Sequence, residues 1–125
     1  MKGANGMDET KNLGFEVMHI GINCGSAEEA GKTANQLEEL FGLETNETPV
    51  SYFSSSRVEI MKKGGAGKNG HIAIGTNDIH AAIDYLKGRG FEFNEKSASY
   101  RPDGSLKLIY LKDEIAGFAF HLLQK

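Results

Sequence analysis

A short sequence motif, histidine-isoleucine-small residue-isoleucine, occurs twice in this chain and constrains its fold more than any other feature. The first copy is residues 19–23 (HIGIN) and the second is residues 71–75 (HIAIG). Each copy is followed by an amphipathic helical stretch and later by a final apolar strand, so the chain is predicted to contain one supersecondary unit twice. Because alternate residues of a strand face opposite sides, both histidines are expected on the face away from the isoleucines.

The composition excludes several classes of function. The chain has 125 residues, of which 39% are hydrophobic and 25% charged, and this is typical of one soluble globular domain. A net charge of −3 without a cluster of basic residues argues against a nucleic-acid partner, and no apolar stretch is long enough to indicate a membrane span. Cys24 is the only cysteine, which indicates a reducing, cytoplasmic compartment. A small molecule is therefore the expected partner.

The domain organisation follows from the repeat. Residues 1–13 lack hydrophobic periodicity and are predicted to be a flexible leader. Residues 14–125 are predicted to be a single domain with a first module at about residues 14–63 and a second at about residues 68–125. A glycine-rich segment, residues 64–70, links the two modules.

Each module is predicted to contain one helix. Ser26 and Glu29 form the Ser-x-x-Glu pattern of a capping box, and Gly42 is suited to end the helix that starts there. A second helix is expected from a cap at Asn77 or Asp78 to the glycines near residue 88. The remaining apolar segments predict strands at residues 15–24, 43–47, 50–53, 57–62, 70–76, 91–97, 106–111 and 117–123.

This order, strand, helix and three strands repeated once, predicts an α+β fold. Two βαβββ modules are expected to form a curved, mostly antiparallel sheet around a central cup, with the helices on its outer face. In the last strand of the first module, Val58 and Ile60 should point toward the helix. Arg57, Glu59 and Met61 should then point into the cup.

Four side chains that bind metals fall on the predicted cup face. His19 and Glu59 occupy the first and last strands of the first module, and His71 and His121 occupy the same places in the second. Three imidazoles and one carboxylate suit a divalent transition metal such as Zn, Ni, Co, Mn or Fe. A metal-free fold with polar cup residues stays open as the alternative, since a strand histidine is often only hydrogen-bonded and Glu59 could pair with Arg57.

The arrangement resembles the vicinal oxygen chelate superfamily, which comprises glyoxalases, bleomycin-resistance proteins and extradiol dioxygenases. The resemblance covers residues 15–125 and rests on the paired modules and their four candidate ligands. The second half also resembles glyoxalase-like domains attached to 2-keto-3-deoxy-6-phosphogluconate aldolases. That likeness is carried by the segments GHIAI at residues 70–74, DG at residues 103–104 and FAFHLLQ at residues 118–124.

The resemblance implies a function and a set of site residues. It implies that His19, Glu59, His71 and His121 hold a divalent metal, with Glu59 as the candidate base. The expected activity is that of a glyoxalase-type lyase or isomerase, which converts a small 2-oxo or hydroxycarbonyl compound through a metal-stabilised enediolate. Family members often pair as homodimers, so a homodimer is expected.

One departure from the family favours a second function. Glyoxalases carry glutamate where this chain has His121, and a metal-bound imidazole is a poorer proton shuttle than a displaceable carboxylate. The alternative is a non-catalytic binding or sequestering module of the bleomycin-resistance type. In either case, five further residues are candidates to contact the ligand, although they could instead pack or be solvated: Arg57, Met61, Tyr52, Tyr110 and Arg101.

Overall fold

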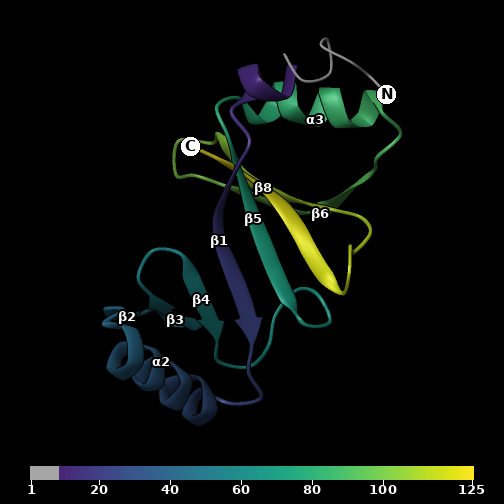
Figure 1. Ribbon diagram of the computed structural model, residues 1–125. Coiled ribbons are helices and arrows are strands. Elements are labelled where there is room, and N and C mark those ends of the chain that lie inside the picture. Colours follow the sequence, from purple (N-terminus) through teal and green to yellow (C-terminus); the bar gives the residue numbers. More distant parts are fainter. Residues whose placement is uncertain (1–8) are drawn as a thin grey trace. The chain divides into compact units, whose positions relative to one another are not determined.

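The computed structural model describes residues 9–125, which fold in the predicted order of strand, helix and three strands, twice (Figure 1). The α+β fold class is therefore confirmed. The strands are β1 (Glu16–Asn23), β2 (Thr45–Glu47), β3 (Ser51–Ser54), β4 (Val58–Met61), β5 (Gly70–Thr76), β6 (Phe93–Tyr100), β7 (Leu106–Leu111) and β8 (Phe118–Gln124). The helices of the two modules are α2 (Ala27–Phe41) and α3 (Ile79–Gly88).

The chain forms two compact units that divide differently from the predicted modules. One unit, called here the histidine unit, comprises residues 18–72 and 114–119. The other, called the C-terminal unit, comprises residues 73–113 and 120–125 together with the described residues before position 18. Three strands, β1, β5 and β8, contribute residues to both units.

The predicted leader falls partly outside the described residues, which begin at residue 9. Residues 9–13 are helical, so the expectation of a flexible segment does not hold for them. Leu13 packs against the core of the C-terminal unit, and its carbonyl accepts a hydrogen bond of 2.7 Å from the Thr76 hydroxyl. The packing of Leu13 and the hydrogen bonds that its carbonyl accepts from Thr76 and Asn77 thus hold a stretch whose sequence has no helical periodicity.

Helix α2 begins and ends where the sequence predicts. The Ser26 hydroxyl accepts a hydrogen bond from the Glu29 amide at 3.1 Å, which satisfies one of the donors that every helix leaves unpaired at its start. Gly42 adopts the left-handed conformation with a φ of 69°, and its amide bonds the Glu38 carbonyl. Both signals are local, and this is why the sequence located this helix well.

In the histidine unit the strands follow the order β2-β3-β4-β1-β5, and α2 packs on one face of β2, β3 and β4 (Figure 1). Its buried residues Ala30 and Ala34 pack against Ile60, which is fully buried, and against Tyr52 and Val58. Strand β1 runs parallel to β4, with Gly21 opposite Glu59 and Ile22 opposite Ile60. The strand residues that alternate with Tyr52, Val58 and Ile60 therefore face away from α2.

The C-terminal unit has its own core under α3. Its strands follow the order β5-β8-β7-β6, and antiparallel pairs join β8 to β7 and β7 to β6. Ile79 and Ala82 of α3 pack on Ile109 and Leu122, all of them buried. The aspartate at position 78 caps this helix by accepting a hydrogen bond of 3.1 Å from the Ala81 amide.

Removing the central side chain of the histidine unit should destabilise the protein. We expect Ile60→Ala to lower the free energy of unfolding by about 2–5 kcal/mol, because it leaves a cavity under α2. Ile20→Ala on β1 is the matched control, since Ile20 is 42% exposed and its truncation should cost less than about 1 kcal/mol. Urea unfolding followed by circular dichroism measures both. Equal losses in the two variants would contradict this account of the core.

Candidate metal centre

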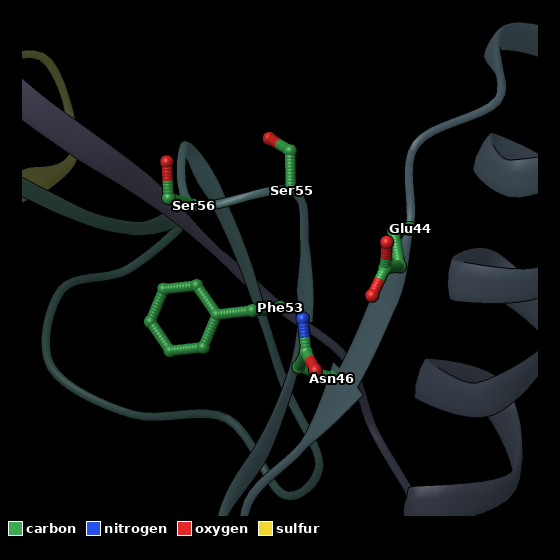
Figure 2. Close-up of a pocket in the computed structure, with 5 residues that line it drawn as sticks. All are labelled: Glu44, Asn46, Phe53, Ser55 and Ser56. Atoms are coloured by element: carbon green, nitrogen blue, oxygen red, sulfur yellow. The ribbon is translucent and has the colours of Figure 1, made fainter.

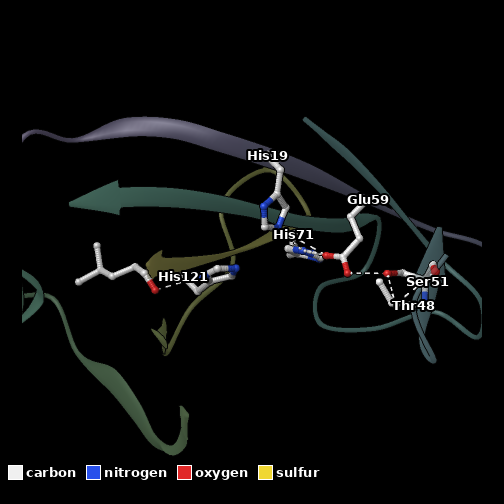
Figure 3. Close-up of polar contacts among 7 residues, drawn as sticks. His19, Thr48, Ser51, Glu59, His71 and His121 are labelled. Atoms are coloured by element: carbon white, nitrogen blue, oxygen red, sulfur yellow. Dashed lines mark hydrogen bonds and ion pairs between the residues drawn. The ribbon is translucent and has the colours of Figure 1, made fainter. Parts of the chain in front are cut away.

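Three of the four predicted ligands meet on the face of the histidine unit that α2 leaves uncovered. His19 projects from β1, Glu59 from β4 and His71 from β5, and Figure 3 shows both imidazoles directed toward the carboxylate. The alternation along the strands explains this placement, since His19 and Gly21 alternate with the isoleucines of β1. The three side chains are largely shielded from solvent, with 14% of His19 and Glu59 and 5% of His71 exposed.

The three facing atoms form a compact triangle. His71 Nε2 lies 3.1 Å from Glu59 Oε1, His19 Nε2 lies 3.5 Å from the same oxygen, and the two nitrogens are 3.2 Å apart. Hydrogen bonds alone can join at most two of the three pairs of atoms. If both imidazole nitrogens donated a proton to the oxygen, their N–H groups would repel each other across the third pair. A cation bound to all three atoms gives each of them a favourable contact.

The size of the triangle fits a transition metal. Ligand atoms about 2.0–2.2 Å from a common ion are separated by about 2.8–3.1 Å at right angles and about 3.3–3.6 Å in a tetrahedron. The observed separations of 3.1, 3.2 and 3.5 Å fall in this range. Two imidazoles and one carboxylate are ligands that zinc and its first-row neighbours accept.

Gly21 provides the space in which the His71 ring lies. A Cβ atom added to Gly21 would stand 2.0 Å from His71 Cε1 and 2.2 Å from its Nδ1, both far inside van der Waals contact. The bare backbone of β1 is therefore what lets the ring pack over the strand and aim Nε2 at Glu59. This is the close approach for which the small residue in the repeated motif is required.

The Glu59 carboxylate is held in its charged form. Its burial alone would raise the pKa, but hydrogen bonds from His19, His71 and Ser51 outweigh burial and hold the pKa of Glu59 far below its usual range. A general base works best with a pKa near the working pH. Hydrogen bonds that favour the ionised carboxylate therefore suit the binding of a cation better than the uptake of a proton.

The fourth predicted ligand lies in the C-terminal unit. His121 projects from β8, is 3% exposed, and has its ring centroid 4.8 Å from that of Tyr110. Its Nδ1 lies 3.1 Å from the backbone oxygen of Leu122, and a carbonyl oxygen only accepts, so Nδ1 carries the proton. The lone pair is therefore on Nε2, which is the nitrogen that a metal ligand at this position would use.

The five candidate ligand-contacting residues are divided between the two units. Met61 lies on the same face as Glu59, whereas Tyr52 packs in the core beneath α2 with Lys62 Nζ 4.8 Å from its ring centre. Arg57 donates to the Met18 carbonyl at 3.3 Å. In the C-terminal unit, Arg101 donates to the Gln124 carbonyl at 2.8 Å, and Tyr110 packs on His121.

An open pocket of about 420 Å³ lies in the histidine unit (Figure 2), and one of its residues contacts the triangle of His19, Glu59 and His71. Phe53 connects the two, since its ring meets the His19 ring edge-on with centroids 5.5 Å apart. The pocket is lined by Glu44, Asn46, Phe53, Ser55 and Ser56. It offers a small ligand an apolar ring and several polar groups close to the candidate metal ligands.

Two residues of the site were missed by the sequence analysis. Ser51 and Thr48 form a chain of hydroxyl groups that ends on Glu59. The short polar loop before β3 was visible in the sequence. Only the register of β3 on β4, with Ser51 opposite Met61 and Phe53 opposite Glu59, shows that Ser51 lies diagonally across from Glu59 on the same face. No spacing rule along a single strand contains that information.

The comparisons with known proteins agree with the fold. No protein-family model matches the chain, and no curated protein matches its sequence. A solved methylmalonyl-CoA epimerase in complex with methylmalonyl-CoA and NH₄⁺ is similar over 90% of this chain and 95% of its own, with 18% identity and a TM-score of 0.66. The methylmalonyl-CoA epimerase of Mycobacterium tuberculosis matches over 86% of both chains, with 13% identity and a TM-score of 0.63.

A third similar structure is a hypothetical protein from Bacillus halodurans C-125, which has 19% identity and a TM-score of 0.56 over 90% of this chain and 95% of its own. These structures have the vicinal oxygen chelate fold, so the predicted fold is confirmed. The likeness to domains attached to aldolases stays a prediction. Within residues 9–125, none of the helices has both the length and the apolar character needed to cross a bilayer.

The role of Gly21 can be tested by adding one methyl group. We expect Gly21→Ala to weaken Co²⁺ binding by at least about tenfold, because the new Cβ displaces the His71 imidazole from Glu59. Titration with Co²⁺, followed by visible absorption, measures the affinity. Gly25→Ala is the matched control, because a Cβ at Gly25 meets no atom within 4 Å. Equal affinities in the two variants would show that the close approach does not matter.

Proposed function

We propose that this chain is a metal-dependent isomerase of the vicinal oxygen chelate type. His19, Glu59 and His71 are the proposed ligands from the histidine unit, and His121 is the proposed fourth ligand. The observation that carries the proposal is the triangle of Glu59 Oε1 and two imidazole nitrogens with sides of 3.1 to 3.5 Å. The similarity of fold to methylmalonyl-CoA epimerases supports it as well.

The proposed substrate is a small carbonyl compound with an acidic C–H bond next to the carbonyl group. A divalent ion bound by these residues would polarise the carbonyl oxygen and make the adjacent proton easier to remove. Candidates are 2-oxo acids, hydroxycarbonyl acids and acyl thioesters, the last because the similar epimerases act on a thioester. The pocket at Phe53 is the proposed place for the rest of the substrate.

The residues of this chain would orient the substrate and keep water away from the reacting atoms. Burial of the three ligands limits the access of water, which strengthens electrostatic interactions at the site. The low pKa of Glu59 keeps its negative charge available to the ion across the physiological pH range. Proton removal is then proposed to depend on a group other than Glu59, unless that carboxylate is released during the reaction.

The low pKa of Glu59 also favours a second candidate function. A binding or sequestering module of the bleomycin-resistance type needs a shaped polar site but no base. In that case the chain would bind a metal or a small ligand at the same residues without turnover. The two candidates differ in one measurable property, which is exchange of a substrate C–H proton with solvent.

A homodimer is proposed for either candidate function, and light scattering after size-exclusion chromatography tests it.

Metal content is the first test of the proposal. We expect protein purified without chelators or a metal-affinity column to contain about one equivalent of a transition metal, because three ligand atoms already converge. His71→Ala should lose it. His80→Ala is the matched control, since His80 is exposed on α3. Elemental analysis measures both variants. If the protein is metal-free and takes up none on titration, the metal centre is wrong.

Solvent exchange then separates the two candidate functions. The metal-loaded protein is incubated in D₂O with 2-oxo acids, hydroxycarbonyl acids and acyl thioesters, and deuterium incorporation next to the carbonyl is followed by NMR. Exchange that is retained in His80→Ala and absent from His71→Ala supports an isomerase. A protein that binds metal and ligand without any exchange is a binding module.

A further inference from the structure

The second oxygen of Glu59 has a partner of its own. Ser51, the first residue of β3, is fully buried, and its Oγ lies 2.7 Å from Glu59 Oε2. An ionised carboxylate only accepts hydrogen bonds, so the Ser51 hydroxyl is the donor. The two carboxylate oxygens therefore have separate tasks: Oε1 faces the imidazoles of His19 and His71, and Oε2 is bound to Ser51 (Figure 3).

Thr48 sets the direction of the Ser51 hydroxyl. Thr48 Oγ1 lies 2.8 Å from Ser51 Oγ and accepts hydrogen bonds from the backbone amides of Val50, at 3.2 Å, and Ser51, at 2.9 Å. Because the only proton of the Ser51 hydroxyl goes to Glu59, the Thr48 hydroxyl donates either to Ser51 Oγ or to the Ser51 carbonyl at 3.2 Å. In both cases the backbone of this loop fixes the position of the hydroxyl chain.

We propose that Ser51, oriented by Thr48, is a positioning residue that makes Glu59 a one-oxygen ligand and so determines which divalent ions this site prefers. The inference rests on the proposed metal centre. A carboxylate with two available oxygens can bind an ion through both, and this suits large ions with many ligands. When Oε2 is bound to a buried hydroxyl, only Oε1 is available, and smaller transition metals are favoured.

The burial of Ser51 makes this restraint strong. If Glu59 rotated to offer both oxygens, the Ser51 hydroxyl would lose its acceptor at a position that water does not reach. A buried hydroxyl without an acceptor is costly, so the carboxylate is held in its present orientation. Hydrogen-bond partners of metal ligands typically change metal affinity by about 10–100-fold when they are removed.

The test compares two serine-to-alanine changes on the same strand. We expect Ser51→Ala to weaken Co²⁺ binding by about 10–100-fold relative to the unchanged protein and to weaken Mn²⁺ binding less. The visible absorption of bound Co²⁺ should become less intense as the coordination number rises. Ser54→Ala is the matched control, because Ser54 is also fully buried on β3 but lies on the α2 face, and it should leave both affinities unchanged.

A second pair of variants covers the case in which Ser51→Ala does not fold. Thr48 is only partly buried, so Thr48→Val removes its hydroxyl with less risk to the core, and Thr48→Ser restores the hydroxyl. We expect weaker Co²⁺ binding and lower absorption intensity in Thr48→Val, and normal values in Thr48→Ser. Thermal unfolding without metal, measured in parallel, separates a change at the site from a change in stability.

The outcomes distinguish this inference from the proposed function. If Ser51→Ala and Ser54→Ala bind Co²⁺ and Mn²⁺ alike while His71→Ala binds neither, the metal centre stands and the role of Ser51 is wrong. Should Ser51→Ala fail to fold, equal binding by Thr48→Val and Thr48→Ser overturns the inference in the same way. If the unchanged protein binds neither ion, the proposed function itself fails.

Discussion

The burial of Ile60 beneath α2 is the contact on which the arrangement of the histidine unit depends. Because side chains alternate along a strand, placing Ile60 and Val58 against the helix directs Glu59 to the opposite face. The parallel pairing of β4 with β1 then sets Gly21 opposite Glu59. An apolar contact that has no part in chemistry thus decides where the carboxylate points, and a one-residue shift of β4 would bury the charge in the core.

Around Glu59, polar contacts compensate for the cost of removing a charge from water. Imidazoles approach one of its oxygens, and a buried hydroxyl donates to the other. A carboxylate with 14% exposure would otherwise tend to bind a proton. These partners keep it ionised instead, which suits a metal ligand and is unfavourable for a base. The charge state of Glu59 therefore depends on its three hydrogen-bonding partners.

Local signals explain how much of the fold the sequence could predict. The Ser26 cap, the left-handed Gly42 and the apolar alternation of β5 and β7 lie within a few residues of the structure they specify, and those elements were placed closely. The ordering of residues 9–13 was missed, because it depends on contacts with α3 and β5 that are distant in sequence. The start of β6 was also shifted by two residues, from 91 to Phe93.

The sequence could predict those parts of the candidate site that depend on side-chain alternation along a single strand. Alternation along β1, β4 and β5 was enough to group His19, Glu59 and His71. It was not enough to find Ser51, which needs the register between β3 and β4.

Gly21 shows a further consequence of the fold. Because the His71 ring is buried and packs directly on the backbone at Gly21, the imidazole has few alternative orientations, and the conformational entropy of ordering it is lost during folding. An ion bound at the proposed centre would meet ligands that are already aligned, so its binding energy would not be spent on arranging them.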